Sequence, residues 1–398
     1  MSSSSPSDVS PEIRLPEQGH TVLSQFELAP ELTHLNHGSY GALPLCVRAE
    51  QERWRARVER DPTGFFQDVY PAAIRDSARN VAGCFGGAAG DWVFCENATV
   101  AANSVFASFP LEAGDEILTT SHAYGAVLKA IRIWAARREA RVKIAELPDI
   151  VESEDQVIEL VTAAFSDRTR LLVIDHITSR TATVLPVKAI AATARAAGIA
   201  VFVDGAHGPG QVPLDVTEIG ADWYTGNAHK WFFAPRGCGL LWTAPERQSQ
   251  TLPVVLSHGS DAGYTAAFDW VGTRDATPWL SFAAAKAAHD HFGGDALMRR
   301  NRALAAEAAD LLCNALDATP AAPPEMRAAM AALCLGHFAD AENRALALRR
   351  DLHRAGFVVP VSAAGDILYL RVSAQIYNEI EDYERFAEAA RRLCRLLR

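Results

Sequence analysis

The sequence predicts an α/β protein with two unequal domains: a large one around a mostly parallel sheet, and a small α+β domain at the C-terminus. Three observations support this prediction. Short apolar or β-branched runs alternate with helical stretches through the first two thirds of the chain, as in a sheet whose strands are joined by helices. Beyond about residue 276, long helices and a short β pair replace this alternation. The chain of 398 residues is also too long for one ordinary core.

The expected elements follow in chain order. We assign residues 1–30, which begin MSSSSPSDVSPE, to a disordered or extended tail, because they have neither the basic nor the apolar region of an export signal. Residues 31–290 form the large domain, whose first helices pack either within it or against the small domain. Residues 291–398 form the small domain. Helical periodicity from Leu43 to about Gly83 is broken at Asp61-Pro62, and expected strands then include DWVFC, DEILTT, RLLVIDH, IAVFVDGAH, DWYTGNAHKW and RGCGLLW. The later stretch MAALCLGH has the character of a helix.

Composition narrows the range of partners and compartments. The formal net charge is −10, from 48 acidic and 38 basic residues, which argues against nucleic acid or an anionic membrane as the main partner. No uncharged apolar run is long enough to span a bilayer. The seven cysteines are scattered without CxxC spacing, which favours reduced thiols in the cytoplasm.

Two residues suggest the chemistry. Asp204 ends the buried run IAVFVDGAH, and ligands gather at the carboxyl ends of parallel strands. A cap on the following loop is the plainer interpretation of this carboxylate. Lys230 follows the next strand and is succeeded by three bulky apolar residues, WFF, which suggests an amine with a lowered pKa. A carboxylate and a desolvated lysine at neighbouring strand ends suit pyridoxal 5′-phosphate (PLP), which has an aldehyde and a cationic ring nitrogen.

Four stretches then indicate a family. LNHGSYGALP, DGAHGPGQVPLD, YTGNAHKWFFAPRGCGLLW and VGTRDATPWL closely resemble the class V aminotransferase superfamily, and within it the branch that is similar to isopenicillin N epimerase. This branch neighbours the cysteine desulfurases and the cysteine-type C–S lyases. The resemblance runs from about Leu35 to the end of the chain and implies the fold type I architecture of PLP-dependent transferases.

The resemblance also implies roles at the cofactor. Lys230 would form the Schiff base and carry the proton of the substrate α-carbon, and Asp204 would pair with the pyridine nitrogen. His207 would lie beside the phenolate oxygen. The remaining cofactor-binding candidates are Ala98 (through its backbone N–H), Thr99, Asn227 and His229 at the phosphate, Tyr124 on the ring face, and Ser179 near the phenolate. From the residues alone, Thr99 is equally an N-cap and Tyr124 a core tyrosine.

Substrate and partner contacts follow from the same resemblance. Arg371, on a short strand in DILYLRVSA, would bind the substrate carboxylate, although a structural ion pair is the alternative. Asn36, His37 and Ser39 of LNHGSYG would approach the substrate, with His37 equally a satisfied loop histidine. Thr273 would reach the phosphate of a neighbouring subunit, which implies a homodimer.

The lack of a cysteine in one segment narrows the choice of reaction. A persulfide-forming desulfurase needs a cysteine on the loop before the carboxylate-binding arginine, and residues 335–371 contain none. We expect a β-eliminating C–S lyase acting on a cysteine-type or sulfoxide amino acid, in a pocket shaped by His258, Tyr264 and Phe268. Tyr124 would have to supply the second acid of an epimerase. An epimerase of the isopenicillin N type and an aminotransferase remain alternatives, and a metal hydrolase using Asp204, His207 and His229 is a remote one, so that no metal is expected.

Overall fold

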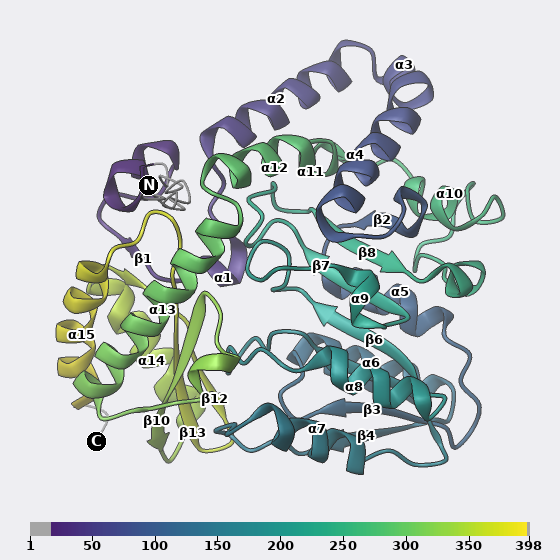
Figure 1. Cartoon of the computed structure of the whole chain (residues 1–398). Helices are drawn as coiled ribbons and strands as arrows, with labels where there is room; N and C mark the ends of the chain where they lie inside the picture. The colour runs from purple at the N-terminus through teal and green to yellow at the C-terminus, as the bar shows by residue number, and fades with distance from the viewer. Residues whose placement is uncertain (1–16, 396–398) are drawn as a thin grey trace, which may run out of the picture.

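A seven-stranded sheet forms the centre of the computed structural model, which describes residues 17–395 of the chain (Figure 1). Within this sheet β8 runs against the other strands, because the loop after β7 returns the chain alongside it. In spatial order the strands are β2 (Trp92–Cys95), β8 (Gly239–Thr243), β7 (Trp223–Asn227), β6 (Ala200–Gly205), β5 (Thr169–Asp175), β3 (Glu116–Thr120) and β4 (Arg141–Ala145). The predicted α/β class with a mostly parallel sheet is confirmed.

Helices cover both faces of this sheet. Along β6, Val201 and Val203 pack into one core, whereas Ala200 and Phe202 pack into the other. Because the central strands are buried on both faces, polar side chains concentrate where the strands end. One face carries α5 (Ala98–Ser108), α6 (Gly125–Arg137) and α10 (Tyr264–Asp269); the other carries α7 (Glu154–Ala163), α8 (Val187–Ala196) and α9 (Val216–Ile219).

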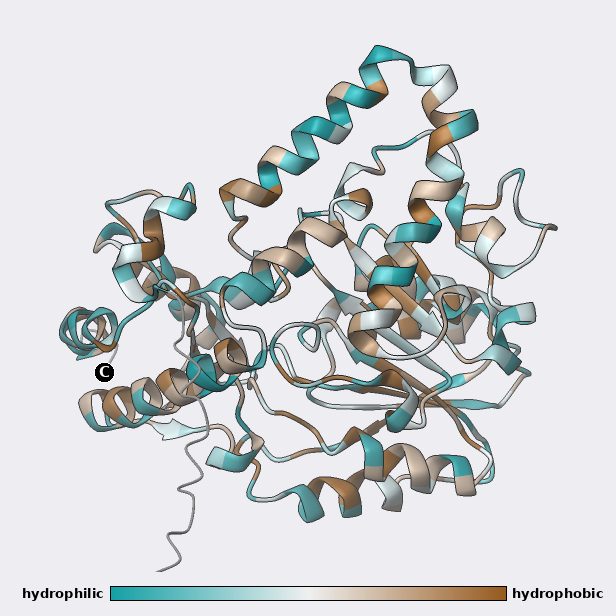
Figure 2. Ribbon diagram, turned by 45° about the horizontal axis from the view of Figure 1, so that its top comes forward, coloured by the Kyte–Doolittle hydropathy of each residue, from teal (hydrophilic) through white to brown (hydrophobic). Residues whose placement is uncertain are grey.

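The helices that precede the sheet belong to the large domain. The buried residues of α2 are Val47 and Gln51, and Figure 2 shows this helix as largely hydrophilic. It contacts α11 and α12, which follow the large sheet along the chain. The predicted break is confirmed, because the Asp61 carboxylate caps the next turn by accepting the Gly64 N–H at 3.0 Å. The bounds are α2 (Leu45–Arg60), α3 (Pro62–Gly64), a π-helical turn (Phe65–Val69), α4 (Tyr70–Phe85), α11 (Thr277–Leu280) and α12 (Phe282–His291).

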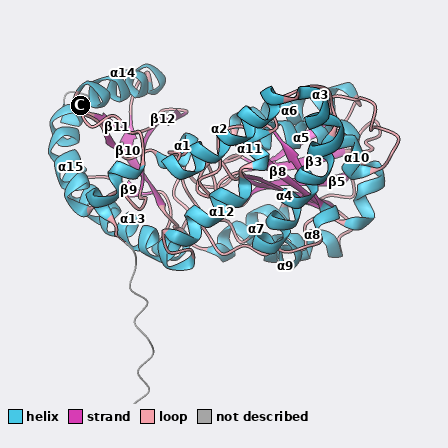
Figure 3. Ribbon diagram, turned by 90° about the horizontal axis from the view of Figure 1, so that it is seen from above, coloured by secondary structure: helices cyan, strands magenta, loops and turns pink. Residues whose placement is uncertain are grey.

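The small domain lies beside the large one (Figure 3), and α13 (Asp295–Leu316) leads into it from the end of α12. An antiparallel sheet packs one face against α13, α14 (Ala341–Arg354) and α15 (Ile380–Arg395). Its other face turns towards the large domain, where Tyr369 packs in one cluster with Trp231. The strands, in spatial order, are β12 (Val361–Ala364), β13 (Ile367–Ser373), β10 (Met330–His337) and β9 (Thr319–Pro320).

The expectation of a helix at MAALCLGH was wrong, because this stretch is β10. Alternate side chains of β10 pack into different clusters, so that Leu333 joins the helices and Met330 joins the face towards the large domain. Both faces are therefore apolar, and the alternation that marks a half-exposed strand is missing. None of the helices in residues 17–395 has the length and apolar character required to cross a bilayer.

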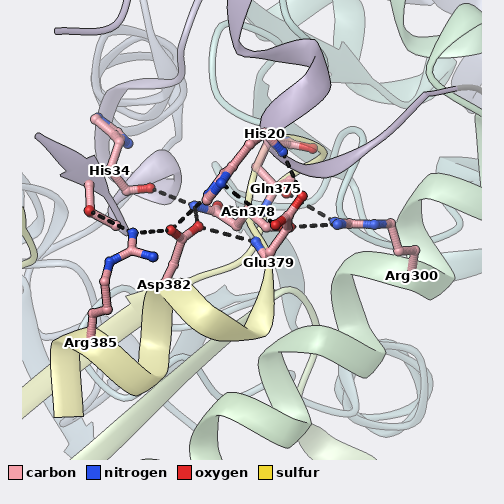
Figure 4. A network of polar contacts seen from close by, with 9 residues as sticks. His20, His34, Arg300, Gln375, Asn378, Glu379, Asp382 and Arg385 are labelled. Atoms are coloured by element: carbon pink, nitrogen blue, oxygen red, sulfur yellow. Dashed lines mark hydrogen bonds and ion pairs between the residues drawn. The ribbon is translucent and has the colours of Figure 1, made fainter. Parts of the chain in front are cut away.

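The predicted tail was wrong for part of its length. Residues 1–16 lie outside the described residues, but a 3₁₀ helix, Gly19–Gln25, is fixed to the start of α15. The His20 ring contacts Asp382 at 2.9 Å, and the His20 N–H donates to Glu379 at 2.8 Å (Figure 4). Strand β1 (Thr33–His34) then pairs with β11 (Phe357–Val358) of the small domain. The first elements of the described chain, the 3₁₀ helix and β1, therefore pack against α15 and β11 near its C-terminal end.

Candidate active site

Asp204 ends β6 at the carboxyl edge of the sheet, as predicted, and is buried. Its Oδ1 accepts the Ala206 N–H at 3.0 Å, whereas its Oδ2 has no partner in the described residues. Burial raises the pKa of this carboxyl, and the Ala206 N–H and the Lys230 charge partly offset the rise. A buried carboxylate oxygen without a donor suits a cationic N–H on a bound ring.

Asp175, which the sequence prediction missed, lies beside it. This residue ends β5, and it stands directly opposite Asp204 in the register of the two parallel strands. Burial and the neighbouring Asp204 charge raise the pKa of Asp175 well above its usual value. Because the rise is the larger one at Asp175, we infer that Asp175 is the member of the pair that more readily keeps a proton. In both RLLVIDH and AVFVDG an apolar run leads into an aspartate, so the pattern that identified Asp204 also marks Asp175.

Lys230 lies in the loop after β7 and lines the same cavity as both carboxyl groups. Burial and the charge of Arg371 lower the pKa of this lysine to about 7, and the charges of Asp204 and Asp175 partly offset the fall. The loop is fixed by Trp231, Phe232 and Phe233, all of which are buried. The apolar run that follows Lys230 is therefore an anchor in the core, and the amine projects from it into the cavity.

The loop LNHGSYG packs closely against the segment His229–Lys230. Gly41 has a φ of 67°, and a Cβ there would lie 2.2 Å from the His229 carbonyl oxygen, so only glycine permits the approach. The His37 ring also joins the two loops, because its Nε2 lies 2.9 Å from the Lys230 carbonyl oxygen and its Nδ1 lies 2.9 Å from the Tyr377 hydroxyl. His37 is fully buried with both ring nitrogens engaged, so the expected substrate contact was wrong and the loop alternative holds.

His207 contacts the lysine directly. Its Nε2 lies 3.1 Å from the Lys230 Nζ, and its Nδ1 accepts the Trp231 indole N–H at 3.4 Å. The indole therefore leaves the ring proton on Nε2, which donates to the neutral amine. Burial and the nearby charges of Lys230 and Arg371 keep the pKa of His207 well below its usual value. His207 is thus uncharged in the free protein, and the Lys230 amine is mostly neutral above pH 7.

The N-terminus of α5 faces the same cavity, and Thr99 lines it. Ala98 also lines the cavity, and its N–H donates to the Asn227 Oδ1 at 2.8 Å, so a phosphate at this position would share the donor with Asn227 or displace it. The Asn97 Oδ1 caps the helix through the Val100 N–H at 3.0 Å. His229 also lines the cavity, and burial lowers its pKa to about 4.

Arg371 closes the opposite end of the site from β13. Its guanidinium donates to the Ser179 carbonyl oxygen, to the Ser39 hydroxyl at 3.0 Å and to the Asn36 amide oxygen at 3.3 Å. Within the described residues it forms no ion pair, and its buried Nε has no acceptor. Burial lowers the pKa of Arg371 to about 10. A buried cation held only by neutral oxygens is suited to an incoming carboxylate.

The other predicted residues divide between the cavity and the core. The cavity has a volume of about 650 Å³ and is lined by Ser39, Tyr124, Ser179 and Asn227 together with Asp175, Asp204 and Lys230. Arg371 lines an adjoining cavity, and Asn36 supports its guanidinium. Tyr124 is 44% exposed at the start of α6, which excludes the core alternative. The expected pocket was wrong: Tyr264 and Phe268 are buried in the core behind α5, and His258 is exposed. Thr273 is exposed as well.

The fold and the site together define a PLP-dependent enzyme of fold type I. Lys230, the unpartnered Asp204 oxygen and the α5 terminus present an amine, a carboxylate and a helix N-terminus, which fit the aldehyde, the ring nitrogen and the phosphate of PLP. The chain belongs to the class V aminotransferase family, which it matches over residues 47–386.

Individual relatives share most of the chain. It is 33% identical to putative L-cysteine desulfhydrase 1 of Oryza sativa subsp. japonica, over 94% of this chain and 87% of that protein. It is 32% identical to isopenicillin N epimerase of Streptomyces clavuligerus, over 91% and 95%. The solved structure of a C-DES variant with glycine linked to its PLP cofactor aligns with a TM-score of 0.78 and 19% identity, covering 92% of this chain and 98% of that one. Within the described residues, no cluster of His, Cys, Asp and Glu is arranged to hold a metal ion.

Proposed function

We propose that this enzyme is a β-eliminating C–S lyase that acts on L-cysteine or an S-substituted cysteine. The observation that carries the proposal is a lysine with a lowered pKa in the main cavity and a buried arginine without an anion in the adjoining one, with no cysteine lining either cavity among the described residues. The first two groups suffice to bind an amino acid and remove its α-proton. Without a cysteine nucleophile, sulfur leaves as a thiol.

Each residue has a defined task in this reaction. Arg371 binds the substrate carboxylate, and Ser39 and Asn36 hold the guanidinium in place. Lys230 removes the α-proton, and His207 keeps its amine neutral and oriented through the 3.1 Å contact. The unpartnered Oδ2 of Asp204 would hold a proton on the ring nitrogen of bound PLP. When bound, PLP supplies an electron-withdrawing ring that stabilises negative charge at the substrate α-carbon.

Two alternatives share the first step. An epimerase needs a second acid on the opposite face of the substrate, and Tyr124 is the group that the cavity offers there; its 44% exposure makes it a poorly shielded donor. The likeness to isopenicillin N epimerase favours this alternative. An aminotransferase would instead move the proton to the cofactor and retain the amino group.

With L-cysteine or S-methyl-L-cysteine, the holoenzyme should release thiol (or hydrogen sulfide), pyruvate and ammonia in equal amounts, because water balances the elimination and hydrolysis. L-Alanine, which lacks a leaving group, is the matched control. In heavy water it should gain deuterium at the α-carbon and keep its configuration, because Lys230 returns the proton to the same face. Recovery of racemised substrate without pyruvate would establish the epimerase instead, and amino transfer from alanine to an added oxo acid would establish the aminotransferase.

We also propose that the enzyme is a homodimer in which Thr273 completes the neighbouring site. Arg274 fixes the segment by donating to Glu96 at 2.8 Å and to the Phe268 carbonyl oxygen at 2.7 Å, and it stacks on Trp279. Thr273 is thereby presented outwards. The nearby run Val254–Leu256 exposes apolar side chains that a partner would cover.

Subunit exchange tests this arrangement. Lys230→Ala and Thr273→Asp should each be inactive alone, the second because it brings a negative charge to the phosphate. A mixed dimer keeps one intact site, so random exchange of equal amounts should restore about a quarter of wild-type activity. Mixing Lys230→Ala with a tagged copy of itself is the control. If the mixture stays inactive although mixed dimers are isolated, or if Thr273→Asp is fully active, each chain has a self-sufficient site.

A further inference from the structure

A second cavity adjoins the candidate active site beyond Arg371. It has a volume of about 260 Å³, and it shares Ser39, Tyr124 and Ser179 with the main cavity. Its further lining comes from His122, Arg180 and Ser362. A group that extends from a substrate bound at Arg371 can therefore continue into this space without leaving the site.

The lining of the second cavity is positively charged although the whole chain carries a net charge of −10. Arg371 and Arg180 are its charged members, and it includes no carboxylate. His122 adds no charge, because burial and the nearby Arg180 lower the pKa of its imidazole. Positive charge concentrated in a concave, partly enclosed space attracts anions.

Arg180 has no ionic partner in the described part of the chain. The nearby carboxylate is Asp149, which accepts the Tyr369 hydroxyl at 2.9 Å and forms no recorded ion pair with Arg180. The loop that carries Arg180 is ordered, because Thr178 and Thr183 close it: the Thr178 N–H donates to the Thr183 carbonyl oxygen at 2.9 Å, and the Thr183 N–H donates to the Thr178 hydroxyl at 2.8 Å. Because this backbone is already ordered, only the Arg180 side chain loses freedom when an anion binds.

We propose that Arg180 forms a subsite for a second anionic group on the substrate, so that the preferred substrate is a cysteine whose sulfur carries a short substituent ending in a carboxylate. The substrate α-carboxylate then binds Arg371, and the distal carboxylate binds Arg180 across the second cavity. This inference rests on the proposed action on cysteine-type amino acids and adds the class of the sulfur substituent.

Two ligands of nearly equal size test the subsite. S-Carboxymethyl-L-cysteine has the distal charge, and S-carbamoylmethyl-L-cysteine replaces it with a neutral amide. The readout is the rapid change in the visible absorbance of the bound cofactor as each ligand is added to the holoenzyme, which reports binding apart from turnover. The wild type should bind the carboxylate about tenfold more tightly than the amide, the value of one charged hydrogen-bonded pair.

Arg180→Gln should remove this preference by weakening the carboxylate alone and leaving the amide unchanged. Arg168→Gln is the matched control, because this exposed arginine precedes β5 whereas Arg180 follows it. Equal binding of both ligands by the wild type, or a preference that survives in Arg180→Gln, would overturn the subsite. A preference that depends on Arg180, seen without release of pyruvate, would refute the lyase and retain the subsite. If neither ligand changes the absorbance, both proposals fail.

Discussion

Lys230→Ala should abolish turnover and remove the covalent attachment of the cofactor. We expect activity to fall by at least about 10⁴-fold, because the change removes both the nucleophile that holds PLP and the base that takes the α-proton. The measurements are the visible absorbance of the holoenzyme, the near-ultraviolet absorbance of the pyridoxyl group that stays with the protein after borohydride reduction and gel filtration, and the rate of pyruvate release. Lys188→Ala, which removes an exposed lysine paired with Glu218, is the control and should match the wild type.

The lowered pKa of Lys230 makes a further prediction for the apoprotein. Only the neutral amine attacks an aldehyde, and it predominates above pH 7 because the pKa is about 7. PLP should therefore be recaptured faster as the pH rises from 6 to 8, rather than only near pH 10 as for an ordinary lysine. A rate that keeps rising towards pH 10 would show that the amine is solvated. A colourless protein that does not take up PLP at any pH, and that loses activity to chelators, would contradict the assignment of Lys230 altogether.

Asp204→Asn should leave PLP bound but slow proton removal from the substrate by about 10²- to 10⁴-fold, which corresponds to about 3–5 kcal/mol in the barrier. The amide cannot hold the proton on the ring nitrogen, so the ring withdraws fewer electrons. The measurement is the rate at which L-alanine exchanges its α-proton in heavy water, since this step precedes loss of sulfur.

Asp175→Asn is the matched control. If Asp175 is protonated at neutral pH, an amide imitates its native state, and the exchange rate should stay within a few-fold of the wild type. A large loss in Asp175→Asn with little loss in Asp204→Asn would exchange the two roles. Near-normal rates in both variants would show that Asp204 only caps its loop and has no role at the cofactor ring.

Much of the fold was predictable because buried parallel strands are continuous apolar runs that end in polar residues. Asp204 was identified in this way. Asp175 ends an equally apolar run, but its importance depends on the register that places it opposite Asp204, and register is a property of the sheet as a whole. Strand β10 was missed because its run MAALCLGH is rich in Met, Ala and Leu, which favour helices, and contains no β-branched residue to mark a strand.

The individual contacts of the site were less predictable than its location. The sequence places Asn36, His37 and Ser39 on one short loop, but only tertiary packing decides which side chain faces the cavity. Ser39 lines it, Asn36 supports Arg371 from behind, and His37 joins two loops. Similarly, the six-residue helix α10 turns Tyr264 and Phe268 inwards to the core, although their spacing would allow either direction.

The contact between His20 and Asp382 limits when the protein can complete its folding during synthesis. These partners are 362 residues apart, so at ordinary rates of synthesis the first waits on the ribosome for about 20 to 70 s before the second appears. The loop that supports Arg371 follows directly after this N-terminal segment, and the Ser373 N–H donates to the Leu35 carbonyl oxygen at 2.9 Å. The large sheet can therefore assemble during translation. The contacts that position Arg371 to bind the substrate carboxylate cannot form until almost the whole chain has been made.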